Sequence, residues 1–205
     1  MNALSSLQNR IAQLRMSHQL GAAFAVVLIL MAALGGVATL ALNHVEAQAE
    51  GLSAKWLAGV GHLSAARTVL GDVRDLEVKH SRTSDKSYHS EYEEKITAGT
   101  QEFNRVLTAY QALPLSSADE AKLVDDLAKA WAAYQKAMNQ VVALGKEKKQ
   151  TDAADISDGA GSMAVDEAMG ALAALTKFNF EGADAAAERA RATHRNALIS
   201  VGALL

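Results

Sequence analysis

The sequence contains no cysteine, a single proline and few aromatic residues. Aromatic side chains account for only 5% of its 205 residues. The lack of cysteine excludes disulfide bonds, thiolate metal sites and the Cys-x-x-Cys-His attachment of a c-type haem. Proline interrupts helices, whereas the alanine and leucine that dominate here favour them. These scarcities predict an all-α fold that is held together by packing alone.

The sequence also lacks the residue patterns of common active sites. Nothing resembles a Ser-His-Asp set or a phosphate-binding loop, and the six histidines lack the spacing of zinc ligands. The segment from Glu77 to His80 matches one motif of di-iron bundles, but those bundles need a second copy and inward glutamates from the other helices. The net charge is −3, and the basic residues do not cluster into the stripe that is typical of nucleic-acid binding. We therefore expect no enzymatic activity, metal ion, cofactor or nucleic-acid partner.

The one long hydrophobic run covers residues 20–42 and carries no charged side chain. As a helix it is about 34 Å long, which exceeds the hydrocarbon core of a bilayer at about 30 Å. A cleaved secretory signal is the alternative, although its apolar core is usually only about 7–15 residues long. Arg10 and Arg15 precede the run and Glu46 follows it. The positive-inside rule therefore predicts a transmembrane helix with residues 1–19 in the cytoplasm.

The chain after this run is expected on the outer side of the membrane. Residues 43–195 are enough for one extracytoplasmic domain with its own core. The final residues, 196–205, are again apolar and uncharged. We interpret them as the start of a second transmembrane helix in a truncated chain.

Four amphipathic helices are predicted within the extracytoplasmic domain. Their apolar residues recur at the alternating 4-3 spacing of a coiled-coil seam, and polar segments or Pro114 separate them. Connections of this length favour an antiparallel up-down-up-down four-helix bundle, continuous with transmembrane helices at both ends. The expected helices cover residues 43–81, 85–113, 117–146 and 156–195.

The last of these helices contains the pattern Leu172-x-x-Leu175-x-x-x-Asn179. With the short basic N-terminus, the spanning helix and the four-helix domain, this pattern resembles the front half of a bacterial methyl-accepting chemotaxis receptor and its four-helix-bundle ligand-binding family. The resemblance implies a homodimer in the bacterial inner membrane, with residues 43–195 in the periplasm. It also implies that the domain binds a ligand there and signals through its last helix to a cytoplasmic kinase or adaptor, by way of a missing C-terminal half. Sensor kinases and diguanylate cyclases carry similar input domains. A ligand-free structural bundle is a third alternative.

Arg67 and Arg74 are the leading candidates for binding that ligand. They flank the seam residues Ala66 and Val73, and a guanidinium group offers a planar fork of donors to a carboxylate. The resemblance likewise implies carboxylate-binding arginines on the first helix and a threonine or aromatics on the last, at a dimer interface. Matching the helices by height completes the candidate set, which is Arg67, Arg74, Tyr92, Thr100, Trp131, Tyr134 and Thr176.

Each candidate also has a purely structural interpretation. An arginine beside a seam can pair with a neighbouring acid such as Asp72, Asp75 or Glu77, and seam aromatics usually belong to the core. If these residues do bind a ligand, two guanidinium groups favour a di- or tricarboxylate, with aromatic acids second. Amino acids rank third, because no inward acidic residue is expected to receive an ammonium group.

Overall fold

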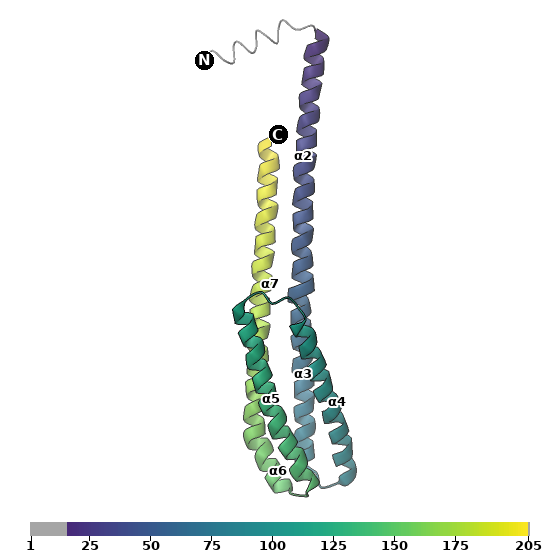
Figure 1. Ribbon diagram of the computed structural model, residues 1–205, viewed down its shortest axis with the longest axis vertical. Coiled ribbons are helices and arrows are strands. Elements are labelled where there is room, and N and C mark those ends of the chain that lie inside the picture. The colour runs from purple at the N-terminus through teal and green to yellow at the C-terminus, as the bar shows by residue number, and fades with distance from the viewer. Residues whose placement is uncertain (1–15, 205) are drawn as a thin grey trace. The chain divides into compact units, whose positions relative to one another are not determined.

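The computed structural model describes residues 16–204, and all of its regular secondary structure is helical (Figure 1). No strand occurs within these residues, so the all-α prediction is confirmed. The chain divides into two compact units, and each is described by itself. The first consists of residues 1–50 and 187–205, and the second of residues 51–186.

The first unit contains α2 (Met16–Gly51), which includes the predicted spanning run. Within the described residues, Leu20–Ala47 is the single helical stretch long and apolar enough to cross a membrane. Its 28 residues extend about 42 Å, and large apolar side chains such as Phe24 are exposed. A helix satisfies its own backbone hydrogen bonds, as a lipid environment requires. Residues 1–15 lie outside the described part, so the cytoplasmic position of residues 1–19 stays a prediction.

The last helix, α7 (Ser162–Leu204), contributes residues to both units. It covers the apolar segment that the sequence assigns to a second membrane span. Leu198 and Ile199 in this segment are exposed, and residue 205 lies outside the described part. The second transmembrane helix therefore stays a prediction.

The second unit begins with a π-helical turn, η1 (Leu52–Leu57), followed by α3 (Ala58–Arg82), α4 (Lys86–Gln111) and α5 (Ala118–Lys146). A short α6 (Gln150–Ile156) and a second π-helical turn, η2 (Ser157–Gly161), lead into α7. Within this unit, α3, α4, α5 and the segment from α6 to α7 lie side by side (Figure 1).

Side-chain caps explain where two of these helices start. Asp85 accepts a hydrogen bond from the backbone N–H of Ser87 (2.8 Å) at the start of α4. Ser117 accepts one from the backbone N–H of Glu120 (3.2 Å) at the start of α5. Such caps satisfy backbone donors that the helix itself leaves unpaired.

The connection after α5 is shorter than the sequence predicts. The polar segment 146–155 is expected to be a loop, but α6 begins within it at Gln150. Lys148, with a φ of 58°, makes the turn and reduces the connection to residues 147–149. The polar segment can be helical because its Ala153 is fully buried and anchors α6.

The core follows the seam predicted for α3 and most of the stripe predicted for α7. Three members of the predicted α7 stripe are buried, namely Val165, Leu172 and Asn179, whereas Met169 and Thr176 are only half-buried. The structure instead buries Ala168 and Leu175, because this alanine-rich helix offers two overlapping apolar stripes. The buried seam of α3 consists of Leu63, Ala66, Leu70 and Val73.

In the contacts between α3 and α4, residues near the start of one helix meet residues near the end of the other. This is the pattern expected of neighbouring helices that run in opposite directions. One pair is a ring stack, and in the other two a glycine lies against a side chain of the facing helix. The pairs are His80 with His89, Val73 with Gly99, and Gly59 with Tyr110.

A close approach between η1 and α7 depends on Gly182. A Cβ atom at this position would fall less than 3.0 Å from the ring of Trp56, which is itself buried. We expect Gly182→Ala to destabilise the chain by about 1–3 kcal/mol, because the ring must leave a well-packed position. The measurement is urea unfolding of the full chain in detergent, followed by far-UV circular dichroism.

Gly170 is the matched control on the same helix, because a Cβ atom there would meet nothing within 4 Å. Gly170→Ala should be neutral or stabilise by up to about 1 kcal/mol through helix propensity. Equal effects of the two substitutions would contradict the packing of Trp56 on Gly182.

Candidate functional site

Arg74 links two elements of the second unit. Its side chain is 19% exposed, and its Nη1 forms an ion pair with Glu77, which is fully buried one turn later on α3. Nη1 also donates to the Ser157 hydroxyl (3.1 Å), and Nη2 donates to the Ser157 carbonyl (3.0 Å). Ser157 opens η2, so this guanidinium ties α3 to the segment that leads into α7. Local π-helical turns frequently occur at functional sites.

The hydroxyl of Tyr134 lies near the same ion pair from α5. Burial raises the pKa of Tyr134, and the negative charge of Glu77 raises it further. Neither Tyr134 Oη nor Glu77 Oε1 has a hydrogen-bond partner among the described residues, although both are buried. A Cβ atom at Gly161 would lie 3.2 Å from Arg74 Nη1 and 3.9 Å from Glu77 Oε1. The second unit therefore encloses a polar cluster with hydrogen-bonding capacity to spare.

The structure brings Arg74 and Tyr134 together, and the ring of Trp131 packs against Tyr134 with centroids 5.8 Å apart. The other predicted site residues make no hydrogen bond, ion pair or ring contact with this group among the described residues. Arg67 is exposed on α3, and Thr100 is half-buried with a buried hydroxyl that has no partner in the described part. Thr176 donates to the Leu172 carbonyl of its own helix (2.7 Å). A ligand role for each of the seven residues stays a prediction.

The two remaining candidates take part in aromatic packing. Trp131 is buried, stacks on Phe103 with ring centroids 4.0 Å apart, and donates its Nε1 to Asn104 (2.8 Å). Tyr92 is half-buried and stacks on Tyr88 with centroids 6.1 Å apart. These contacts are those of ordinary core and surface aromatics.

A second buried polar cluster lies where α3, α4 and the end of α5 meet. The rings of His80 and His89 stack with centroids 4.3 Å apart. His80 Nε2 lies 3.2 Å from one oxygen of Glu93, and Lys146 pairs with the other (2.8 Å). A carboxylate only accepts hydrogen bonds, so Nε2 is the donor. Burial lowers the pKa of His80, the charge of His89 adds to this effect, and Glu93 opposes it.

A third polar cluster surrounds Glu120, at the opposite end of α5. Glu120 Oε1 accepts from Tyr110 (3.0 Å), whose hydroxyl in turn accepts from Asn179 of α7 (2.7 Å). The other oxygen accepts from Lys55 (3.1 Å) and from the backbone and hydroxyl of Ser116 (2.7 and 2.8 Å). Burial raises the pKa of Glu120, but these donors outweigh it and hold that pKa below the usual 4.5. Four segments of the second unit are joined to α5 here.

A family model described as a four helix bundle sensory module for signal transduction matches residues 13–194. This match covers most of the chain. The chain belongs to this family. No curated protein matches it significantly. The family that the sequence resembles is thereby confirmed, and the sensory module is a signalling input domain, not a catalytic one.

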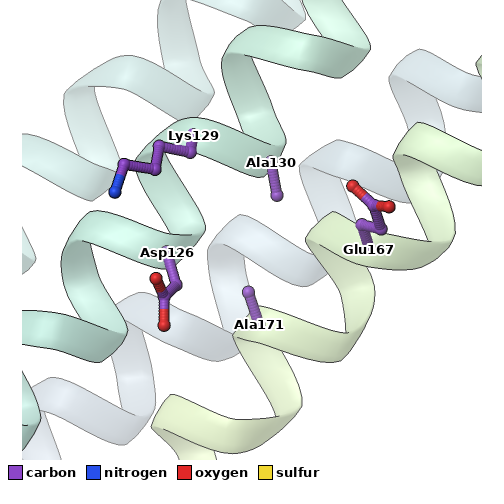
Figure 2. A pocket seen from close by; sticks show the side chains of 5 residues that line it. All are labelled: Asp126, Lys129, Ala130, Glu167 and Ala171. Atoms are coloured by element: carbon purple, nitrogen blue, oxygen red, sulfur yellow. The ribbon is translucent and has the colours of Figure 1, made fainter.

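The sensory module also carries a surface groove between α5 and α7 (Figure 2). It has a volume of about 330 Å³ and is lined by Asp126, Lys129, Ala130, Glu167 and Ala171. Lys129 already pairs with Asp125 and Asp126 with Lys122 on the surface of α5. None of the predicted ligand-binding residues lines this groove. In residues 16–204, no group of three or more histidine and acidic side chains is placed to hold a metal ion.

The helical periodicity of the sequence indicates that three titratable residues are buried, although their polarity predicts that they are exposed. The expectation that no acidic residue points inward is wrong, because Glu77 and Glu120 are 0% and 2% exposed. Continuing the 4-3 seam of α3 beyond Val73 reaches Glu77 and then His80. The 4-3 spacing predicts an α5 seam that starts with Leu123 and Leu127, and extending it backwards by three residues reaches Glu120. Periodicity thus places all three in the core of the sensory module, despite their polarity.

Proposed function

We propose that this sensory module is the extracytoplasmic ligand-sensing and transmembrane signalling part of a chemotaxis receptor. The observation that carries the proposal is the family match over residues 13–194, which includes an apolar helix able to span a membrane. Alternatively, the module is the input domain of a membrane sensor kinase or of a diguanylate cyclase. A ligand-free structural bundle is the alternative without sensing.

The proposed assembly is an inner-membrane homodimer with an up-down-up-down bundle in the periplasm. The opposed residue numbering of the α3–α4 contacts supports this topology. Residues 1–19 lie in the cytoplasm, residues 43–195 outside, and α7 enters the membrane a second time. A small shift of α7 on ligand binding passes to a cytoplasmic kinase or adaptor through a C-terminal half. A ligand can do this only if it binds one arrangement of the helices more tightly than the other.

The proposed ligand is a small organic acid, with a di- or tricarboxylate favoured. Arg67 is exposed and can receive a carboxylate directly, in keeping with a site at a dimer interface. Arg74 lies two turns further along α3, where Glu77 already occupies part of its donor fork. A second ligand carboxylate would compete with Glu77 for this guanidinium. That competition would weaken the hydrogen bonds from Arg74 to Ser157. Because Ser157 opens the turn that leads into α7, the start of α7 would then be free to shift.

A thermal-shift screen of the full chain in detergent tests the ligand class. The panel contains di- and tricarboxylates, aromatic acids and amino acids. A ligand at 100 times its dissociation constant should add about 2.7 kcal/mol of stability. We expect hits among the di- and tricarboxylates, and a loss of at least about tenfold in affinity in Arg67→Ala, because a charge-assisted hydrogen bond contributes about 1.5–3 kcal/mol.

Arg105→Ala is the matched control, because Arg105 is exposed on α4 and pairs only locally with Glu102 (2.6 Å). For Arg74 we would use Arg74→Met with Glu77→Leu, which removes the guanidinium without leaving a buried charge. Unchanged affinity in both Arg67→Ala and this double variant would refute the arginine site. If no compound in the panel raises the melting temperature of a folded sample, the result would favour the ligand-free structural bundle.

A further inference from the structure

The cluster of His80, His89, Glu93 and Lys146 holds together three helix ends in the second unit. His80 stands near the end of α3, His89 and Glu93 near the start of α4, and Lys146 at the end of α5. His89 Nε2 also donates to the Thr83 carbonyl in the turn between α3 and α4 (2.7 Å). None of these residues belongs to the proposed carboxylate site.

The packing around His80 leaves no room for the ring to adjust. His80 is 0% exposed, and a Cβ atom at Gly145 of α5 would lie only 2.5 Å from its Cε1. With Nε2 donating to Glu93, the other ring nitrogen, Nδ1, is buried and has no hydrogen-bond partner among the described residues. A neutral ring tolerates this, because Nδ1 is then an uncharged acceptor.

Protonation changes this balance. Nδ1 would become a buried donor without an acceptor, which costs the desolvation free energy of that group. The positive charge would lie in a ring stacked 4.3 Å from that of His89 and near the ammonium group of Lys146. Among the described residues, Glu93 is the one acid that pairs with the ring, and it already pairs with Lys146. The closed cluster therefore disfavours proton uptake.

The other titratable groups on the packed elements do not compensate that charge. Glu77, one turn earlier on α3, pairs with Arg74. Asp152 and Asp155 of α6 are exposed, as is Asp158 of η2, which pairs with Arg82 (2.7 Å).

We propose that this histidine cluster is a proton-binding latch through which the sensory module responds to acid outside the cell, as a second stimulus beside its organic ligand. Proton uptake by His80 separates the end of α5 from the α3–α4 turn. Lys146 is followed directly by the connection 147–149, α6 and η2, so movement of the end of α5 reaches the start of α7. The latch acts independently of Arg67 and Arg74.

The sign of the pH dependence follows from linkage. The pKa of His80 is lowered from its ordinary value of 6.5 in the closed cluster, so the opened form binds the proton more tightly. The closed latch is therefore stable above about pH 6.5 and is lost as the pH falls toward the lowered pKa. Lys146 and His80 hold the pKa of Glu93 below 4.5 despite the opposing effect of burial. Glu93 therefore keeps its charge through this window.

A distance measurement on the full chain in nanodiscs tests the latch. Because the chain has no cysteine, Lys86→Cys and Glu147→Cys place two spin labels uniquely, one on α4 and one after α5. Both positions are exposed. Pulsed electron paramagnetic resonance at pH 7.5 and pH 5.0, in a buffer free of organic acids, should show a longer and broader distance distribution at the lower pH. The midpoint of the change should lie below pH 6.5.

His80→Gln keeps a polar side chain that cannot take up a proton, and we expect it to lose the pH response. His89→Gln removes a ring that helps to lower the pKa of His80 in the closed cluster. It should therefore reduce the pKa difference between the closed and opened forms and move the midpoint to lower pH, and it provides the test if His80→Gln does not fold. His62→Gln, on the same helix as His80, should respond as the wild type does. Identical distributions at both pH values in the wild type would overturn the latch. So would a full response in His80→Gln or an unchanged midpoint in His89→Gln. These distance measurements are made without any organic acid in the buffer, so their outcome is independent of the organic-acid screen.

Discussion

Glu77→Ala is expected to destabilise the sensory module by about 3–5 kcal/mol, toward the lower end of that range because Arg74 is 19% exposed. The substitution removes the fully buried carboxylate that neutralises Arg74 and leaves an uncompensated charge beside the core. The Arg74–Ser157 hydrogen bonds between α3 and η2 should weaken with it. Urea unfolding of the full chain in detergent, followed by far-UV circular dichroism, gives the change in unfolding free energy.

Two further variants separate the buried pair from a general charge effect. Asp75→Ala removes an exposed partner of Lys79 on the same helix (2.6 Å) and should change stability little. Arg74→Met with Glu77→Leu should recover most of the stability lost in Glu77→Ala, because apolar residues of similar volume replace buried ion pairs well. If Glu77→Ala cost no more than Asp75→Ala, the ion pair would not stabilise the core as described.

The second large effect is expected from Glu120→Ala, at about 3–5 kcal/mol. Glu120 accepts hydrogen bonds from Tyr110, Lys55 and Ser116 while being 2% exposed. Its removal leaves these donors without their common acceptor. It also removes the partner that orients the Tyr110 hydroxyl toward Asn179 of α7. We therefore expect both lower stability and weaker attachment of α7, which hydrogen exchange of residues near Asn179 would report.

The pH dependence of this cluster distinguishes it from the histidine latch. The pKa of Glu120 is held below 4.5, so its contribution to stability is present above about pH 4.5 and is lost as the pH falls through the lowered pKa. The difference in unfolding free energy between wild type and Glu120→Ala should therefore shrink below about pH 4.5. A difference that is already lost between pH 6.5 and 5 would contradict this assignment.

Much of the fold could be predicted from the sequence, because its strongest signals are long and periodic. The uncharged run at 20–42 and the α3 seam from Leu63 to Val73 need no knowledge of distant contacts. The details that failed depend on such contacts. On α7, Ala168 and Leu175 are buried more deeply than the predicted Met169 and Thr176, because alanines give that helix two similar faces. The start of α6 at Gln150 was missed because the polar residues around it also suit a loop.

The candidate site was harder to predict, because polarity and periodicity disagree there. Arg74 and Tyr134 were selected on their chemistry and do lie close together. Glu77 and His80 continue the α3 seam, yet charged and titratable residues are normally assigned to the surface. Only the partners supplied by the fold make their burial possible. Glu77 is paired by Arg74 of its own helix, but His80 depends on Glu93 and His89 of α4, which no local pattern connects to it.

The most direct test of the proposed function is a chimera in which residues 1–205 replace the input half of a chemotaxis receptor. Kinase activity is measured in membrane vesicles as di- and tricarboxylates are titrated. Sensing predicts a saturable change in kinase activity, with the half-maximal concentration raised at least about tenfold by Arg67→Ala and unchanged by Arg105→Ala. A chimera that assembles and activates the kinase, but whose activity no member of the ligand panel alters, would contradict the account and leave a structural bundle.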